Sequence, residues 1–437
     1  MRGGDGLLLA VPDGRVIFHA ACPGKAHPAI PMGIGLVDNS RKTDRNRTGG
    51  AIAPCHRGKG EALDTILVET IASCAEGPRV AIKDTIDIAG HATRAASRVL
   101  ADAPPAERDA DVVSALRKAG CRIIGKANMH EFAYGVTGVN HWTGTAPNPL
   151  YPGLIPGGSS SGSAAAVAAG IADFALGTDT GGSIRMPAAC CGVYGLKPSF
   201  GRVSRTGVMP AATTLDCVGP FARDMAMIEQ AMAMIDPSFN SLPAPSAPRI
   251  GLVRVEAAEA VAATFADVVR RSGLFAAPVD LPDFGRAFDA GLAVIGAESW
   301  RAFGAHVDHP ALGEDIRARL RAASGIDPVQ LTEAEAVRAR FAAQVDAALD
   351  RFDALALPTL PDPVPTLAEA TDARAVIRVT AFVRPFNLSG HPAISLPLAE
   401  ASGRPVGIQL VGRRGEDEAL CAVARAFVAS LVPARAA

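Results

Sequence analysis

Apolar positions in this chain fall alternately at helical and strand spacing from about residue 62 onward. The segment 62–75 (ALDTILVETIASCA) has apolar residues near helical spacing, whereas 79–90 (RVAIKDTIDIAG) alternates like a strand. The segment 109–128 predicts a helix that ends at Gly120, followed by a buried strand at 121–125. Helices followed by apolar strands, repeated along a chain, predict an α/β sheet covered by helices.

The middle and the end of the chain continue this pattern. The segment 163–182 predicts a helix, then a short strand at Phe174–Leu176 and a glycine turn. Four prolines within 236–251 mark the clearest connector, because proline cannot continue a helix and cannot donate within a sheet. Further strands and a C-terminal helix are predicted within 249–255, 352–361, 387–398 and 405–431.

These elements predict one α/β domain over residues 61–437, with a mixed twisted β-sheet core surrounded by helices. Strands near both ends of this region are expected to share one sheet. A mainly helical insertion is expected at about 250–350. Residues 1–60 are rich in Gly, Pro, Arg and Asn and show weak periodicity, so we expect an irregular or poorly ordered segment there.

Composition and charge exclude several classes of protein. The 437 residues are 49% hydrophobic and 20% charged, which is enough apolar material for a large core. With a formal net charge of −1, the chain has no excess of positive charge that would favour binding to nucleic acid or an anionic membrane. Apolar runs are too short for a membrane helix or a signal peptide, so a cytoplasmic location is expected.

Cysteine and histidine usage gives no support to metal chemistry. The eight cysteines include no CxxC pair, and the nine histidines include no HExxH motif. In a chain of this length that pattern argues against a disulfide framework and a structural zinc site. We therefore expect no metal and no organic cofactor.

Glycine and serine gather in the stretch Pro156–Gly170 (PGGSSSGSAAAVAAG), which has the composition of a flexible linker. It runs into an alanine-rich segment, and a second glycine-rich stretch follows within 177–187 (GTDTGGSIRMP). Neither stretch has the lysine of a Walker loop or the GxGxxG fingerprint, and neither forms a GxSxG nucleophile elbow. Nucleotide binding therefore has little support.

The second stretch is suited to acyl transfer. Gly181 and Gly182 allow successive backbone N–H groups to turn inward and hold an oxyanion, and Ser183 follows directly. A serine nucleophile needs a base, and no histidine lies nearby. Lys83 lies among apolar strand residues, where burial could keep its amine neutral. The alternative is an ordinary strand-end lysine paired with a neighbouring aspartate.

Residues 157–204 resemble, almost throughout, the Gly/Ser-rich hallmark of the amidase signature family of serine hydrolases. The lysine motif of that family is similar to VAIKDTIDIAG, and its C-terminal segments are similar to FNLSGHPAISLPL and GIQLVGRRGEDEALCAVA. The resemblance covers roughly 62–225 and 350–428 and implies the amidase-signature fold.

The resemblance also implies roles for individual residues. Ser183 matches the acyl-forming nucleophile, Ser159 the bridging serine that follows a cis peptide bond, and Lys83 the base. The 24-residue separation of the two serines agrees with the family spacing. The implied oxyanion hole consists of backbone N–H groups of Thr180, Gly181, Gly182 and Ser183. Ser160, Asp179 and Arg185 match supporting positions, although an ordinary Arg185–Asp179 ion pair explains them equally well.

Substrate contacts are less clearly marked. The segment 128–144 corresponds to the part of the family that lines the acyl pocket, which places Ala133 and Tyr134 near the substrate. It resembles MDEFAMG of the tRNA amidotransferase A subunit, but His130 stands where that pattern has aspartate. One interpretation places Arg384 and Trp142 at the pocket as well, but the sequence favours a surface arginine and a packed tryptophan.

The implied activity is hydrolysis of a carboxylic amide, or of a related carbamate or urea-like bond, through an acyl-enzyme on Ser183. The expected partner is a small-molecule amide, and we expect no nucleic-acid or membrane partner. Whether the chain forms a homodimer is left open by the sequence. One alternative is the A subunit of a glutamine-dependent tRNA amidotransferase, which would co-purify with further subunits. A second is a non-catalytic binding protein on the same scaffold.

Overall fold

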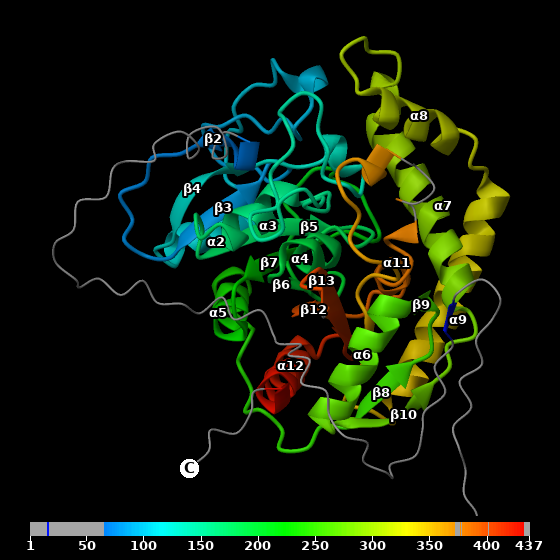
Figure 1. Ribbon diagram of the computed structural model, residues 1–437. Coiled ribbons are helices and arrows are strands. Elements are labelled where there is room, and N and C mark those ends of the chain that lie inside the picture. The colour runs from blue at the N-terminus through cyan, green and yellow to red at the C-terminus, as the bar shows by residue number, and fades with distance from the viewer. Residues whose placement is uncertain (1–14, 17–64, 372–375, 377, 401, 432–437) are drawn as a thin grey trace, which may run out of the picture.

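Strands from both halves of the chain form one mixed sheet in the computed structural model, which describes residues 15–16, 65–371, 376, 378–400 and 402–431 (Figure 1). The eleven strands of this sheet are, in spatial order, β10 (Phe275–Val279), β8 (Ile250–Val253), β11 (Ala354–Pro358), β13 (Pro405–Val411), β12 (Ala393–Ala399), β6 (Tyr194–Lys197), β7 (Cys217–Ala222), β5 (Phe174–Asp179), β3 (Arg79–Lys83), β4 (Arg122–Ala127) and β2 (Leu67–Thr70). Strand β3 runs parallel to β4 and β5. The neighbouring pairs β5–β7, β7–β6, β6–β12 and β12–β13 are antiparallel. The predicted α/β fold with a mixed sheet is confirmed.

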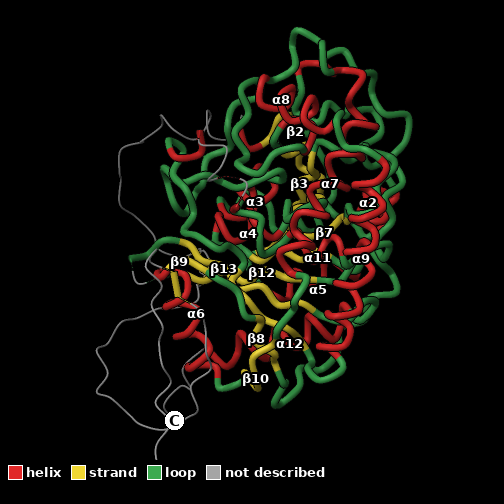
Figure 2. Tube along the Cα trace, turned by 90° about the vertical axis from the view of Figure 1, so that its right-hand side faces the viewer, coloured by secondary structure: helices red, strands yellow, loops and turns green. Residues whose placement is uncertain are grey.

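Helices cover both faces of the sheet (Figure 2). They are α2 (Asp111–Lys118), α3 (Ser161–Ala168), α4 (Arg185–Cys191), α5 (Met225–Ile235), α6 (Glu259–Ser272), α7 (Phe284–Phe303), α8 (Glu314–Ala323), α9 (Pro328–Leu349), α11 (Arg384–Leu388) and α12 (Asp417–Leu431). In Figure 2, α3 and α4 lie on one side of the strands, and α2, α5 and α12 on the other. None of the helices in the described ranges is long and apolar enough to cross a membrane.

Alternation along β3 and β5 explains how the two helical layers differ. Ala81 of β3 and Ala175 of β5 face the buried alanines of α3. The larger side chains that alternate with them along each strand face the core on the opposite side of the sheet. Small residues on both surfaces let α3 approach the sheet closely. Gly162 of α3 has no room for a side chain, because a Cβ there would lie 2.4 Å from the Asn128 backbone nitrogen.

Two expectations about elements need correction. The segment 62–75, expected to be helical, contains the strand β2, which pairs antiparallel with β4 at the edge of the sheet. β-branched Val68 and Thr70 favour an extended backbone, and pairing with β4 prevails over the helical spacing. The strand expected at Phe174–Leu176 continues to Asp179, because its whole length pairs with β7.

Segment 250–349 contributes to both the sheet and a helical layer. Strands β8 and β10 extend one end of the sheet, and α7, α8 and α9 pack together beside α11 on one flank (Figure 1). Strand β9 (Ala257–Ala258) pairs antiparallel with β1 (Arg15–Val16). The expectation for residues 1–60 otherwise falls outside the described residues.

Candidate active site

Lys83 lies at the carboxyl end of β3, next to the parallel strand β5. Its side chain is 0% exposed, and its Nζ lies 2.8 Å from Ser159 Oγ and 2.7 Å from Thr178 Oγ1. Parallel neighbours end at the same sheet edge, which is where ligands bind in open α/β sheets. The register of β3 and β5 therefore brings Lys83 beside the glycine-rich turn that follows β5.

Ser159 and Ser160 lie between the glycines of the first Gly/Ser-rich stretch and the start of α3. The Gly158–Ser159 peptide bond is cis, as the resemblance implies. The Ser159 carbonyl accepts a hydrogen bond from His130 N at 3.0 Å, and Ser160 Oγ donates to the Thr178 carbonyl at 3.2 Å. This segment is thus held on several sides and is not a linker.

The turn from Thr180 to Ser183 is organised by the buried carboxylate of Asp179. Gly182 N–H donates to Asp179 Oδ1 at 2.7 Å, so this member of the predicted oxyanion hole is already engaged. No hydrogen bond among the described residues uses the backbone N–H of Thr180, Gly181 or Ser183. Those three groups are the predicted donors that stay available to an oxyanion.

Arg185 fixes Asp179 and ties the turn to the C-terminal part of the chain. Its Nη2 lies 2.9 Å from Asp179 Oδ1, and its Nη1 donates to the Val383 carbonyl at 2.7 Å and to Gln409 Oε1 at 2.6 Å. Asn387 Nδ2 also donates to Asp179 Oδ1, at 2.8 Å. Burial alone would raise the pKa of Asp179, but Arg185 and these hydrogen bonds hold that pKa below its ordinary value.

Burial lowers the pKa of Lys83 from 10.5 to about 7, and the negative charges of Asp216 and Asp179 limit the fall. A lysine with a pKa near neutrality has a large neutral fraction at pH 7. Its free lone pair can then accept a proton from the Ser159 hydroxyl across their 2.8 Å contact.

The pH dependence of the reaction tests this assignment. Only neutral Lys83 accepts a proton, so kcat/KM should fall about tenfold per pH unit below the lysine pKa and level off above it. With the pKa at about 7, the inflection should appear near neutral pH. An inflection near the ordinary lysine value, or no ascending limb between pH 5 and 8, would contradict a neutral Lys83 base.

A cavity of about 350 Å³ opens beside Ser183, which is 7% exposed. Ala133, Tyr134, Thr180 and Gly181 line it, as do Arg319 of α8 and Arg384 of α11, with apolar side chains of α7 and α8 forming much of the remaining wall. The expectation that Arg384 lies on the surface is wrong: its residue is only 5% exposed. Helix α7 covers Arg384 of α11. No local sequence pattern in α7 or α11 indicates that these two helices pack together.

His130 lies under the cavity rather than in its lining. Its ring is 3% exposed, and its Nε2 lies 3.0 Å from Asp315 Oδ2 of α8. The ring packs against Gly135, where a Cβ would lie 2.0 Å from His130 Nε2. This residue therefore joins the loop that carries Tyr134 to the helical layer.

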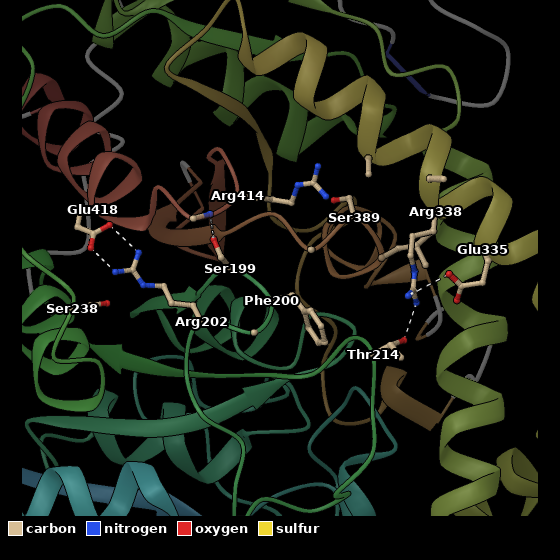
Figure 3. A pocket seen from close by; sticks show the side chains of 16 residues that line it. Ser199, Phe200, Arg202, Thr214, Ser238, Glu335, Arg338, Ser389, Arg414 and Glu418 are labelled. Carbon is tan, nitrogen blue, oxygen red and sulfur yellow. Dashed lines mark hydrogen bonds and ion pairs between the residues drawn. The ribbon is translucent and has the colours of Figure 1, made fainter.

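A larger cavity, of about 920 Å³, lies elsewhere and shares no lining residue with the cavity at Ser183. Figure 3 shows it between Arg202 with Glu418 on one side and Arg338 with Glu335 and Thr214 on the other. Its arginines are ion-paired: Arg202 with Glu418, Arg338 with Glu335, and Arg414 with Asp346. We therefore place the chemistry in the smaller cavity.

Two residues of the site were not among those predicted from the sequence. Thr178 Oγ1 is the second partner of Lys83 Nζ, and Asn387 braces Asp179 from a distant part of the chain. The extended strand β5 was the signal for Thr178, since its side chain lies on the Lys83 side of the sheet edge. Asn387 lies within a matched C-terminal segment, but only the folded chain shows which group it contacts.

Comparison with known proteins gives consistent matches over most of the chain. A family model described as Amidase matches residues 75–421. The A subunit of the glutamyl-tRNA(Gln) amidotransferase of Methanospirillum hungatei is 34% identical over 397 residues, covering 80% of this chain and 92% of that protein. The protein of the same description from Thermus thermophilus is 36% identical over 394 residues, covering 80% of this chain and 83% of its own.

A solved structure supports the same family. A crystal structure described as that of an amidase superposes with a TM-score of 0.74 at 32% identity, covering 81% of this chain and 85% of that chain.

These matches overturn one expectation. The resemblance implies a small-molecule amide as partner, and the charge balance predicts no nucleic acid. The two relatives, however, are described as subunits of an amidotransferase that acts on glutamyl-tRNA. A net charge of −1 averages over the whole chain, so it cannot exclude a local contact or a partner subunit that binds the nucleic acid.

Proposed function

Because this chain belongs to the amidase signature family and is an amide-cleaving enzyme, we propose that it breaks the amide C–N bond through an acyl-enzyme on Ser183. The observation that supports this most strongly is the fully buried Lys83, 2.8 Å from Ser159 Oγ and beside the turn that carries Ser183. A buried lysine of this kind has the pKa that a general base requires.

In the proposed reaction, protons move through Ser159. Ser183 Oγ attacks the amide carbon and gives its proton to Ser159 Oγ, while Ser159 gives its own proton to Lys83 Nζ. The relay then runs in reverse and protonates the leaving nitrogen, which is a poor leaving group unless it is protonated. A primary amide thus releases ammonia and leaves its acyl group on Ser183.

Water completes the cycle through the same groups. Lys83, neutral again, draws a proton from water through Ser159, and the hydroxide attacks the acyl carbon. The bond from that carbon to Ser183 Oγ then breaks, and the relay returns the proton to Ser183 Oγ. During both steps the carbonyl oxygen carries negative charge, and in this proposal it accepts hydrogen bonds from the backbone N–H groups of Thr180, Gly181 and Ser183, which no hydrogen bond among the described residues uses. Asp179 and Arg185 hold this turn in place and do not touch the reacting atoms.

The specific role that we propose is that of the A subunit of a glutamyl-tRNA(Gln) amidotransferase. In this role glutamine is the amide. The ammonia released at Ser183 displaces phosphate from a glutamyl carboxylate on tRNA that further subunits have first activated with ATP. The proposal rests on 34–36% identity over 80% of this chain to proteins of that description.

A glutaminase assay tests this role. The purified chain is incubated with glutamine, alone and together with the further subunits, glutamyl-tRNA, ATP and Mg²⁺, and ammonia, glutamate and glutaminyl-tRNA are measured. We expect glutamine hydrolysis that increases when charged tRNA and the other subunits are present. Co-purification of those subunits with the tagged chain should accompany it.

Two other outcomes are informative. If the chain cleaves simple amides such as butanamide but never glutamine, the amide chemistry stands and the amidotransferase role is wrong. If Ser183→Ala cleaves glutamine as fast as the unmodified chain, the Ser183 mechanism itself is wrong.

A further inference from the structure

The cavity beside Ser183 carries positive charge without a matching acid. Arg319 and Arg384 line it, and no aspartate or glutamate is present among the described residues of its lining. Asp289 and Asp315 are close enough to act on these arginines electrostatically, but neither lines the cavity. Asp315 is moreover hydrogen-bonded to His130.

Arg384 is the more buried of the two arginines. Its Nε and Nη1 are buried and have no hydrogen-bond partner among the described residues, although its residue is only 5% exposed. The guanidinium carbon stacks over the Phe288 ring at 4.7 Å. Arg185, by contrast, is equally buried but donates to Asp179, Val383, Gln409 and Asn387.

Buried donors without acceptors are costly, and buried cations in proteins are normally paired. Burial, together with the charge of Arg319, lowers the pKa of Arg384 from 12.5 to about 9, although Tyr134 and Asp289 oppose the fall. An anion bound in the cavity would supply both the missing acceptors and the missing charge.

The position of Arg384 connects it to the reacting end of the cavity. A Cβ added to Gly181 would lie 3.3 Å from Arg384 Nε, so this nitrogen lies against the turn that supplies the oxyanion donors. On the other side, a Cβ on Gly291 of α7 would lie 2.8 Å from Arg384 Cγ. Glycine at these two positions makes room for the arginine stem between the turn and α7.

We propose that Arg384, with Arg319, forms a subsite that binds a carboxylate on the acyl part of the amide substrate. This proposal rests on the proposed amide cleavage at Ser183 and names the substrate class: amides with a free carboxylate on the acyl side. The planar guanidinium presents paired donors that match a carboxylate. Glutamine belongs to this class through its α-carboxylate, as do the monoamides of short dicarboxylic acids.

The first experiment measures selectivity. The kcat/KM for succinamate and glutaramate is compared with that for butanamide and pentanamide, which have the same chain lengths with a methyl group in place of the carboxylate. We expect the unmodified chain to prefer the acidic amides by about 100-fold, and Arg384→Gln to reduce that ratio about 30-fold or more, since charge-assisted hydrogen bonds are among the strongest. Arg384→Lys should restore part of the ratio.

The matched control is Arg286→Gln. Arg286 is on α7 with a side chain that is 74% exposed, so this change removes the same charge outside the cavity and should leave the ratio unchanged. A chain that shows no preference for acidic amides, or an Arg384→Gln variant that loses both classes equally, would overturn the carboxylate subsite.

The second experiment measures binding without chemistry. Titration calorimetry of glutaramate and pentanamide into Ser183→Ala should show binding of glutaramate that weakens about 30-fold or more when Arg384→Gln is added. If no amide is cleaved by the unmodified chain but glutaramate binding still depends on Arg384, the subsite stands and the proposed function is wrong. If Ser183→Ala, folded by circular dichroism, binds glutaramate no better than pentanamide, the subsite is wrong.

Discussion

We expect Lys83→Ala to lower kcat for amide cleavage by about 10³- to 10⁴-fold while the protein stays folded, since a positioned general base contributes a factor of this size. The physical reason is that Lys83 Nζ is the proton acceptor within 2.8 Å of Ser159 Oγ. Without it, neither serine can lose its proton at neutral pH. The fold should persist, because Ser159 and Thr178 keep their backbone hydrogen-bond environment and no buried charge is left unpaired.

Steady-state kinetics and circular dichroism check this prediction together. Lys83→Met, which nearly preserves the side-chain volume, should lose activity to the same degree and excludes a cavity effect. Lys118→Ala removes an exposed lysine from α2 and should retain full activity. Activity of folded Lys83→Ala within a few-fold of the unmodified chain would eliminate the serine–lysine relay.

The positions of Lys83, Ser159 and Ser183 could be predicted because each lies at an element boundary that the local sequence specifies. An alternating strand ends at Lys83, and an alanine-rich helix begins just after Ser159 and Ser160. Parallel strands β3 and β5 then bring these boundaries to one sheet edge. Local pattern and sheet topology together therefore determine where these three residues lie.

Arg384 could not be predicted in the same way. Its burial depends on α7, which lies about ninety residues earlier in the chain and belongs to segment 250–350, outside the motifs that carry the resemblance in the sequence. The same segment supplies Arg319 and the apolar wall of the cavity. Residues that bind a substrate commonly lie on parts of a scaffold that differ between functions. Local periodicity in such a segment does not show which distant residues it packs against.

Gly182 shows a further limit of prediction from motifs. The motif assigns its N–H to the oxyanion hole, yet the carboxylate of Asp179 accepts that N–H at 2.7 Å. Asp179 in turn is held by Arg185 and Asn387, which are remote from one another in the sequence. The competition between a carboxylate and an oxyanion for one donor is decided by this network and not by the glycine pattern.

We expect Ser183→Ala to abolish covalent labelling and to lower kcat by about 10⁴- to 10⁶-fold, as removal of the nucleophile does in serine hydrolases. A fluorophosphonate or sulfonyl fluoride should add one mass label to the unmodified chain, on Ser183. The label should form there because Ser183 borders the cavity and follows the turn with the available N–H groups, whereas Ser159 is 0% exposed.

Peptide mapping by mass spectrometry locates the label. Ser163→Ala is the matched control. It removes a serine hydroxyl from the first Gly/Ser-rich stretch, which also contains Ser159, and this hydroxyl donates to the Leu176 carbonyl at 2.9 Å where α3 packs on the sheet. It should be labelled like the unmodified chain, and Lys83→Ala should be labelled far more slowly. If Ser183→Ala still takes up one label, and the label maps to Ser159 or another serine, then the nucleophile is not Ser183 and the direction of the proton relay must be reversed.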